Sequence, residues 1–254
     1  MIIYPLASSI VNPGDSLYEA FVVALRRNRI RLKSGDIVAV SSKVVATSES
    51  AIVDSRTIPP SDEAGALARA HSLPPRFVQV VMDEADRVLG GVRGALLTVK
   101  DGDATANAGV DRKNAPAGTY IVWPRNSDLS AKKLRLAIAK KLRRKVGVLI
   151  VDSRVAPLRL GTIGLAIGTS GFRPVEDVRG KVDLRGRRVE ITLRAVADGL
   201  AASAHLVMGE AAEKKPFVII RGSPVQFGSD VGIRSAKLAP KQCLYMSQIL
   251  TKTG

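Results

Sequence analysis

The chain has 254 residues, of which 46% are hydrophobic, and it carries a formal net charge of +16 at neutral pH. This length supplies apolar material for one large domain or two small ones, and no apolar run of about 18 residues predicts a transmembrane helix. Cys243 is the only cysteine, which excludes an internal disulfide framework and a cysteine zinc cluster. The N-terminal segment lacks the basic stretch of a secretory signal, so a cytoplasmic location and no membrane partner are predicted.

The charge balance indicates which partners the chain binds. An excess of lysine and arginine favours anionic partners such as nucleotides and phosphorylated metabolites. His71 and His205 are the only histidines, so a bound metal is expected to be a hard cation held by oxygen ligands. The sequence has no nucleic-acid-binding motif and only 4% aromatic residues. A nucleic-acid partner is therefore not expected.

Hydrophobic periodicity predicts a mixed succession of helices and strands. The predicted helices are 15–29, one that starts at 61, 75–84, 127–144 and 197–212, and the predicted strands are 37–41, 95–99, 105–110, 119–123, 146–151, 189–193 and 216–220. The glycine-rich stretch 154–171 is predicted to be irregular, and the tail from 223 onward is either a helix or an arm packed on a neighbour. Because strands and helices do not alternate regularly, the fold class is predicted to be α+β. Two lobes are expected to divide near 125–150.

The segment 105–111 is the first candidate site. Small residues and Gly109 at the end of a predicted strand let the backbone approach a ligand closely. Asp111 then lies where the strand gives way to a loop, which is a favoured place for functional side chains. An ordinary turn capped by the Asp111 side chain explains the same pattern equally well.

The segment 146–153 is the second candidate site. An apolar strand that ends in Asp152 and Ser153 brings two oxygen ligands to the edge of a sheet. Nucleotide-hydrolysing proteins hold magnesium in this way. Together, Asp111 and Asp152 predict a two-carboxylate site for a hard cation, if the fold brings them together. The alternative is a strand followed by a simple cap.

Two further features favour anion binding, and each has a structural alternative. The glycines of 161–171 either cradle phosphate through backbone N–H groups or serve tight strand turns. The sequence contains neither a P-loop nor a dinucleotide-binding glycine motif, so these folds are excluded for a bound nucleotide. The basic helix 127–144 is either an anion-attracting surface or a solvated face.

These segments together resemble the coenzyme F420-0:L-glutamate ligase family, also called the F420 gamma-glutamyl ligases. The resemblance covers most of residues 1–222, and it leaves 223–254 as a C-terminal extension. The residues that carry it include Gly35-Asp36-Ile37-Val38, Ser42-Lys43-Val44-Val45, Ala106-Asn107-Ala108-Gly109-Val110-Asp111 with Asn114, Asp152-Ser153, Val207-Met208-Gly209 and Arg221-Gly222. The resemblance implies an α+β fold peculiar to the family, with two lobes, mixed and antiparallel sheets and flanking helices, in a homodimer.

The resemblance also implies a chemistry. Family members use GTP to activate a carboxylate of the F420 precursor as an acyl phosphate, which the amine of L-glutamate then attacks. Mg²⁺ or Mn²⁺ assists, and so does a monovalent cation such as K⁺. Carried over to this chain, Asp111, Asp152 and Ser153 are the expected metal ligands, and both aspartates are expected to be catalytic. The residues expected to contact GTP or substrate are Lys43, Asn107, Ser153 and Arg221, with Asn107 and Asn114 also shaping the turn around Asp111.

The chain departs from the family pattern after the second acidic motif. The usual arginine and glutamine are replaced by Ala156 and Thr162, and a carboxylate of the following helix motif is replaced by Gly199. Loss of a guanidinium removes five donors and a charge. Arg154 and Arg159 are the candidates to compensate, and Arg159 is assigned as catalytic. The alternative is a divergent member that binds nucleotide or metabolite with an altered substrate or without catalysis.

Overall fold

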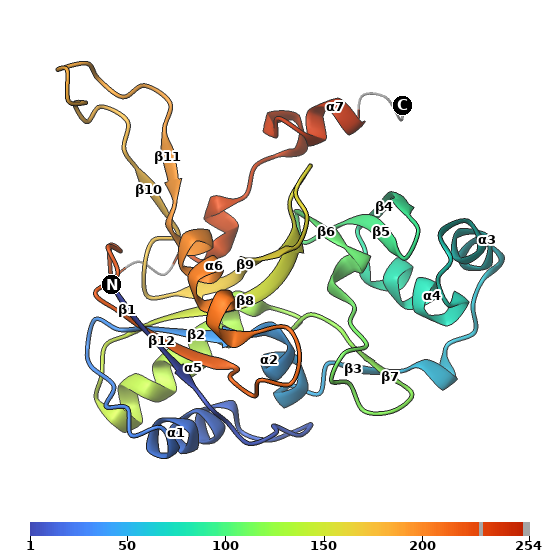
Figure 1. The fold of residues 1–254 in the computed structure, drawn as a ribbon, viewed down its shortest axis with the longest axis horizontal. Coiled ribbons are helices and arrows are strands. Elements are labelled where there is room, and N and C mark those ends of the chain that lie inside the picture. Colours follow the sequence, from blue (N-terminus) through green and yellow to red (C-terminus); the bar gives the residue numbers. More distant parts are fainter. Residues whose placement is uncertain (229–230, 251–254) are drawn as a thin grey trace.

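The computed structural model describes residues 1–228 and 231–250, and a five-stranded sheet forms its centre (Figure 1). The strand order is β1-β12-β2-β8-β9, and within this sheet only the β2–β8 pair is parallel. The strands are β1 (Ile2–Leu6), β2 (Ile37–Ser41), β8 (Gly147–Val155), β9 (Thr162–Ser170) and β12 (Phe217–Arg221). Because β2 and β8 are in the middle, both are buried on two faces, as their continuous apolar runs predict.

Helices cover both faces of this sheet. On one face, α1 (Leu17–Arg27), α2 (Ser42–Ser48) and α5 (Ser127–Leu142) pack against Val38, Val40, Val148 and Ile150. On the other face, α6 (Val196–Met208) packs against the alternate residues Ile37, Ala39, Leu149 and Val151. The alternation follows from the two-residue period of a strand. The sheet is therefore the middle layer of three.

A second lobe is inserted between α2 and α5 and has its own hydrophobic cluster (Figure 1). Its elements are β3 (Ile52–Asp54), α3 (Asp62–His71), α4 (Pro75–Glu84), β4 (Arg87–Val92), β5 (Ala95–Lys100), β6 (Asp103–Ala106) and β7 (Thr119–Ile121). The chain enters this lobe after α2 and leaves it before Trp123, which belongs to the cluster of the central sheet. The sequence predicted a single division near 125–150, whereas the chain crosses between the lobes twice.

The part of the tail that the structure describes packs back on its own chain. The side chain of Ile233 is buried under α6, and its backbone N–H donates to Asp128 at 2.9 Å. Lys237 forms an ion pair with Asp103 of β6 at 2.8 Å. The segment thus joins the start of α5 to the second lobe, and it ends in α7 (Met246–Leu250).

The region after β8 differs most from its prediction. Residues 154–171, predicted to be irregular, form most of the long β8–β9 hairpin. Its glycines serve close packing: a Cβ on Gly164 would lie 2.3 Å from the Ala201 carbonyl oxygen of α6, and one on Gly168 would lie 2.5 Å from the backbone of Ser127 in α5. The strand predicted at 189–193 was wrong, since β10 (Val175–Asp177) and β11 (Leu193–Ala195) form only the base of a projecting arm (Figure 1).

Most predicted helices are confirmed with small shifts at their ends. Among the described residues, the elements that were not predicted are β1, α2, β3, β4, β9 and β10. The α+β fold class is confirmed. No helix in residues 1–228 and 231–250 is long and apolar enough to cross a membrane.

Candidate functional site

A cavity of about 300 Å³ opens at the carboxyl ends of the two parallel strands. The pairing of β2 with β8 ends at Ser41 and Val151, and both of these residues line the cavity together with Lys43 and Asp152. Among the residues that line it are Lys43, Asp152, Ser153, Glu210, Lys214 and Lys215. Side chains from three separate parts of the chain thus meet where the sheet ends, which is a common place for a binding site.

Lys43 joins the two carboxylates that the sequence singled out. Its ammonium lies 2.9 Å from Asp111 Oδ2 and 3.7 Å from Asp152 Oδ1. Because α2 starts directly after β2, Lys43 stands in the first turn beside β8, while Asp111 comes from the second lobe. Burial alone would lower the pKa of Lys43, but the charges of Asp152 and Asp111 outweigh it and raise that pKa above its usual 10.5. The lysine is therefore charged at neutral pH.

The Asp152 carboxylate is buried and held on both oxygens. Ser42 Oγ donates to Oδ1 at 2.8 Å, and Trp123 Nε1 donates to Oδ2 at 2.5 Å. Gly109 makes the Trp123 contact possible, since a Cβ there would lie 2.1 Å from the indole nitrogen, and its φ of +70° also favours glycine. The glycine of the 105–111 segment therefore admits a tryptophan ring that orients Asp152.

The residues at this position suit a hard divalent cation. The Lys43 ammonium already lies between two carboxylates, so the geometry favours positive charge there. Asp111, Asp152 and the Ser153 hydroxyl offer only oxygen donors, as magnesium and manganese require. In the part of the chain that the structure describes, no three His, Cys, Asp or Glu side chains converge closely enough to hold a metal by themselves. A bound cation thus needs water or substrate oxygens to complete its coordination.

Comparison with known proteins gives the site its context. The family model of F420-0:gamma-glutamyl ligase matches residues 5–222. The chain belongs to the F420-0:gamma-glutamyl ligase family. It is 40% identical to the coenzyme F420:L-glutamate ligase of Methanopyrus kandleri over 89% of this chain and 88% of that protein. Identity to the enzyme of the same name from Methanocaldococcus jannaschii is 41%, over 79% of this chain and 81% of that protein. The Archaeoglobus fulgidus enzyme is 37% identical over 84% of each chain.

Four of the residues predicted from the F420-0:gamma-glutamyl ligase resemblance meet at the cavity. Lys43, Asp152 and Ser153 line it, and Asp111 reaches it through Lys43. The Asp111 side chain also accepts a hydrogen bond from the backbone N–H of Lys113 at 2.7 Å, as the predicted turn requires. The ligand roles of these residues stay predictions.

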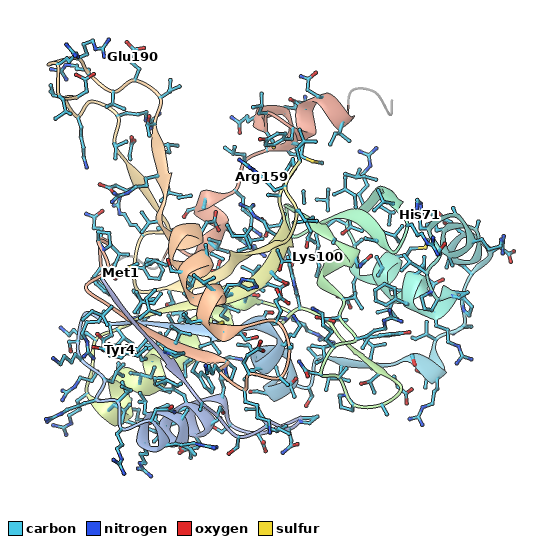
Figure 2. The ribbon with its side chains drawn as sticks, in the orientation of Figure 1. Met1, Tyr4, His71, Lys100, Arg159 and Glu190 are labelled. Carbon is cyan, nitrogen blue, oxygen red and sulfur yellow. The ribbon has the colours of Figure 1, made fainter. Side chains whose placement is uncertain are left out.

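Asn114, predicted to shape the turn around Asp111, also lines the cavity, whereas the other three predicted residues lie elsewhere. Asn107 adopts a positive φ of 52° and accepts the backbone N–H of Leu96 at 2.8 Å, so it shapes the turn before Asp111. Arg159 is exposed in the turn between β8 and β9 (Figure 2). Arg221 binds Asp36 beside the amino end of β2, at the opposite end of the central sheet from the cavity. The cavity lining includes none of the three.

Sequence reasoning missed a second polar cluster, which is centred on Glu210 at the cavity. His205 Nε2 lies 2.6 Å from the Glu210 carboxylate, and Thr162 and Lys113 donate to it at 2.9 and 3.1 Å. Burial of Glu210 opposes its ionisation, but these three contacts outweigh burial and lower its pKa to about 2. The available signal was the position of Glu210 directly after Val207-Met208-Gly209, one of the matching motifs. Thr162, where the resemblance led us to expect a glutamine, therefore helps to hold this carboxylate.

Proposed function

We propose that this protein is a GTP-dependent ligase that forms an amide bond between L-glutamate and the coenzyme F420 precursor. Its proposed cofactors are magnesium or manganese and a potassium ion. The observation that carries the proposal is the convergence of Lys43, Asp111 and Asp152 at one cavity in a member of this family. Asp111 and Asp152 are far apart in sequence, so their contact with the same lysine depends on this fold.

The proposed reaction has two steps. A carboxylate oxygen of the precursor attacks the γ-phosphorus of GTP, and GDP leaves, which gives an acyl phosphate. The amine of L-glutamate then attacks the acyl carbon, inorganic phosphate leaves, and one proton is released as the amide forms. A divalent cation supplies charge neutralisation at the transferring phosphoryl group when it is bound.

The chain's own residues account for the binding of phosphate. Asp111, Asp152 and Ser153 are the proposed ligands of the cation. The Lys43 ammonium stands between the two carboxylates, so arrival of a cation would release it toward the phosphate oxygens. Lys214 and Lys215 line the same cavity and add positive charge. The cavity therefore suits a polyanion bound together with a cation.

The residues that depart from the family pattern support the alternative of a member that binds without catalysis. Ala156 provides no donor, and a Cβ at Gly199 would have nothing within 4 Å, so no neighbouring side chain fills the place of the missing carboxylate. The exposed Arg159 is the proposed substitute for the missing arginine, and its distance from the cavity lining weakens that assignment.

One assay separates the two functions. The purified protein is incubated with GTP, manganese, L-glutamate and the F420 precursor, and product mass and GDP are followed over time. Glutamylated product that requires all four components supports the ligase. Saturable binding of GTP without GDP release would support the binding function and overturn the ligase. Repeating the assay with ATP tests the proposed preference for GTP, and omitting potassium tests the monovalent cation. The homodimer is checked by light scattering of the same sample.

A further inference from the structure

A strongly basic surface lies at the amino ends of β2 and β8, at the opposite end of these strands from the cavity. Two segments lead into the strands: residues 26–33 read RRNRIRLK and residues 140–145 read KKLRRK. We call their cations the basic edge. Its members are Arg26, Arg27, Arg29, Arg31, Lys33, Lys140, Lys141, Arg143, Arg144 and Lys145. Neither segment contains an acidic residue.

The fold brings the two segments together. Arg144 Nε donates to the Leu32 carbonyl at 3.2 Å, and the Lys145 carbonyl accepts the backbone N–H of Gly35 at 2.9 Å. The helices that carry the segments, α1 and α5, lie side by side on the same face of the central sheet (Figure 1). Two short basic stretches more than 100 residues apart thus form one surface.

This charge is not neutralised locally. In residues 1–228 and 231–250, Lys141 is the only member of the basic edge that pairs with a carboxylate, and its partner is the exposed Glu19 at 3.0 Å. The nearby Asp36 is buried and already bound by Arg221. All members are exposed except Arg144, which is half-buried. The side chains therefore repel one another in the absence of an anion.

Helix ends explain only a small part of this charge. Cations near the last turn of a helix stabilise it, but each helix end carries only about half a negative charge. Two helix ends thus account for about one of the ten positive charges. Arg29 and Arg143 moreover adopt positive φ angles of 55° and 52° just where α1 and α5 end. Glycine is the usual residue there, and a long unbranched side chain such as that of arginine is strained in this conformation, so local stability favours glycine at both positions.

The chemistry of this surface fits a polymer of phosphates. Exposed and mobile cations bind single anions weakly, but each contact to a repeated phosphate backbone releases a counterion and adds to affinity. The apolar residues within the two segments, Ile30, Leu32 and Leu142, pack into the core or against it, so none is free to insert into a lipid layer. The two segments of the basic edge contain no aromatic residue on which a base could stack, but backbone binding to a duplex does not need stacking.

We propose that the basic edge binds the phosphate backbone of a nucleic-acid duplex, without sequence specificity, independently of the ligase cavity. The cavity lies about 15 Å away along β2 and β8. This assignment revises the expectation from the sequence, which considered stacking platforms and recognised motifs but could not place the two segments together. Duplex RNA and duplex DNA share the same backbone chemistry, and the experiment separates them.

The test is fluorescence anisotropy with labelled duplex RNA and duplex DNA of about 20 base pairs, at potassium chloride from about 50 to 200 mM. We expect log Kd to rise linearly with log salt, with a slope of about 0.9 for each phosphate contact. The variant Arg29→Gly/Arg143→Gly removes two charges while supplying glycine at the two positions where the backbone favours it. Its slope should fall by about 2 and its affinity at low salt should drop by tenfold or more.

The matched control is Arg76→Gln/Arg93→Gln, which removes the same charge from exposed positions in the second lobe. Equal weakening in the control, or unchanged binding in the glycine variant, would overturn the proposal. So would the absence of duplex binding at about 50 mM salt, or tighter binding to vesicles that contain phosphatidylserine. Tighter binding to either duplex RNA or duplex DNA supports the proposal and identifies which nucleic acid the basic edge binds. Ligase turnover of the glycine variant should be unchanged, so a failed ligase assay leaves this test intact.

Discussion

The two ends of the parallel pair β2–β8 each carry a buried acid bound to a base, yet they serve different purposes. At the amino end, Arg221 Nε and Nη2 donate to both oxygens of Asp36 at 2.8 Å, and the Arg221 guanidinium also lies over the ring of Tyr4. At the carboxyl end, a single ammonium, that of Lys43, is shared between two carboxylates beside a cavity. The first arrangement is complete, whereas the second leaves room for a ligand.

This difference teaches that a motif residue cannot be assigned a role from its charge. Lys43 and Arg221 both lie in segments that resemble the family, and both were predicted to contact GTP or substrate. A bidentate arginine–carboxylate pair uses most of the guanidinium donors and fixes its geometry, which suits a structural tie. A lysine between two acids is easily displaced by a divalent cation, which suits a binding site. The following predictions test this contrast.

The largest effect is expected at the cavity end. Asp152→Asn keeps the shape of the side chain, and its amide oxygen can still accept from Trp123 Nε1. Its NH2 group then donates to Ser42 Oγ instead of accepting from it, and the charge that faces the proposed cation is removed. Ligase turnover should fall by about 10³-fold or more, which corresponds to about 4 kcal/mol of transition-state stabilisation. Product mass against time measures the loss, and circular dichroism confirms the fold. Asp86→Asn, an exposed change in the second lobe, is the control and should keep full turnover.

At the amino end, the effect should be on stability instead. Arg221→Met leaves Asp36, which is only 1% exposed, without its counter-charge. The free energy of unfolding should fall by about 3 kcal/mol, since a buried carboxylate that loses its partner is strongly destabilising. Urea unfolding measures this change. The KM for GTP should stay the same at a temperature where the variant is folded. A raised KM with unchanged stability would restore the predicted phosphate role of Arg221.

A smaller effect on stability, which depends on pH, is expected where the tail contacts the second lobe. It tests whether the ion pair of Lys237 with Asp103 stabilises the lobe that carries Asp111. Burial raises the pKa of Asp103 above its usual 3.8, in spite of the opposing Lys237. Lys237→Met should therefore cost about 1–2 kcal/mol at pH 7, where Asp103 is ionised without its partner. At pH 4 the carboxyl takes up a proton and most of this cost should disappear. Urea unfolding at both values measures the difference, with the exposed Lys241→Met as the matched control. An equal loss at both pH values would contradict this account.

The smallest effect on stability is expected in α6, which packs along β2 and β8 on one face of the central sheet. Gly199 lies within the helix, and an added Cβ would meet nothing within 4 Å. Gly199→Ala should raise the free energy of unfolding by about 0.5–1 kcal/mol, because glycine is a poor helix former. Differential scanning calorimetry measures the gain. Gly199→Glu, which places a carboxylate at this exposed position, should fold equally well. A lowered melting temperature in either variant would show that this helix face is in contact with another surface.

The sequence predicted most of the fold elements and the core of the site, and its failures have physical causes. The strands that contain Val38 and Val148 were found because continuous apolar runs mark burial on both faces. The long β8–β9 hairpin was missed because Gly164 and Gly168 look like turn residues, whereas they admit neighbouring helices. Asp111 and Asp152 were singled out because each ends a predicted strand, although β8 continues to Val155 and a turn at Asn107–Gly109 precedes Asp111. Glu210 was missed because its position directly after Val207-Met208-Gly209 does not show that its side chain meets His205 and Thr162 at the cavity.

By itself, the sequence determined the family, the α+β class, the acidic segments and the large excess of positive charge, since these follow from residue identity, order and local periodicity. Only the tertiary structure decided which charges meet. It placed Lys43 between Asp111 and Asp152, and it placed Arg221 at the end of the sheet opposite the cavity. It also brought two basic segments together into one surface. Such contacts join residues tens to more than a hundred positions apart in the chain. They depend on how strands pair and which face each helix covers, which no local pattern records.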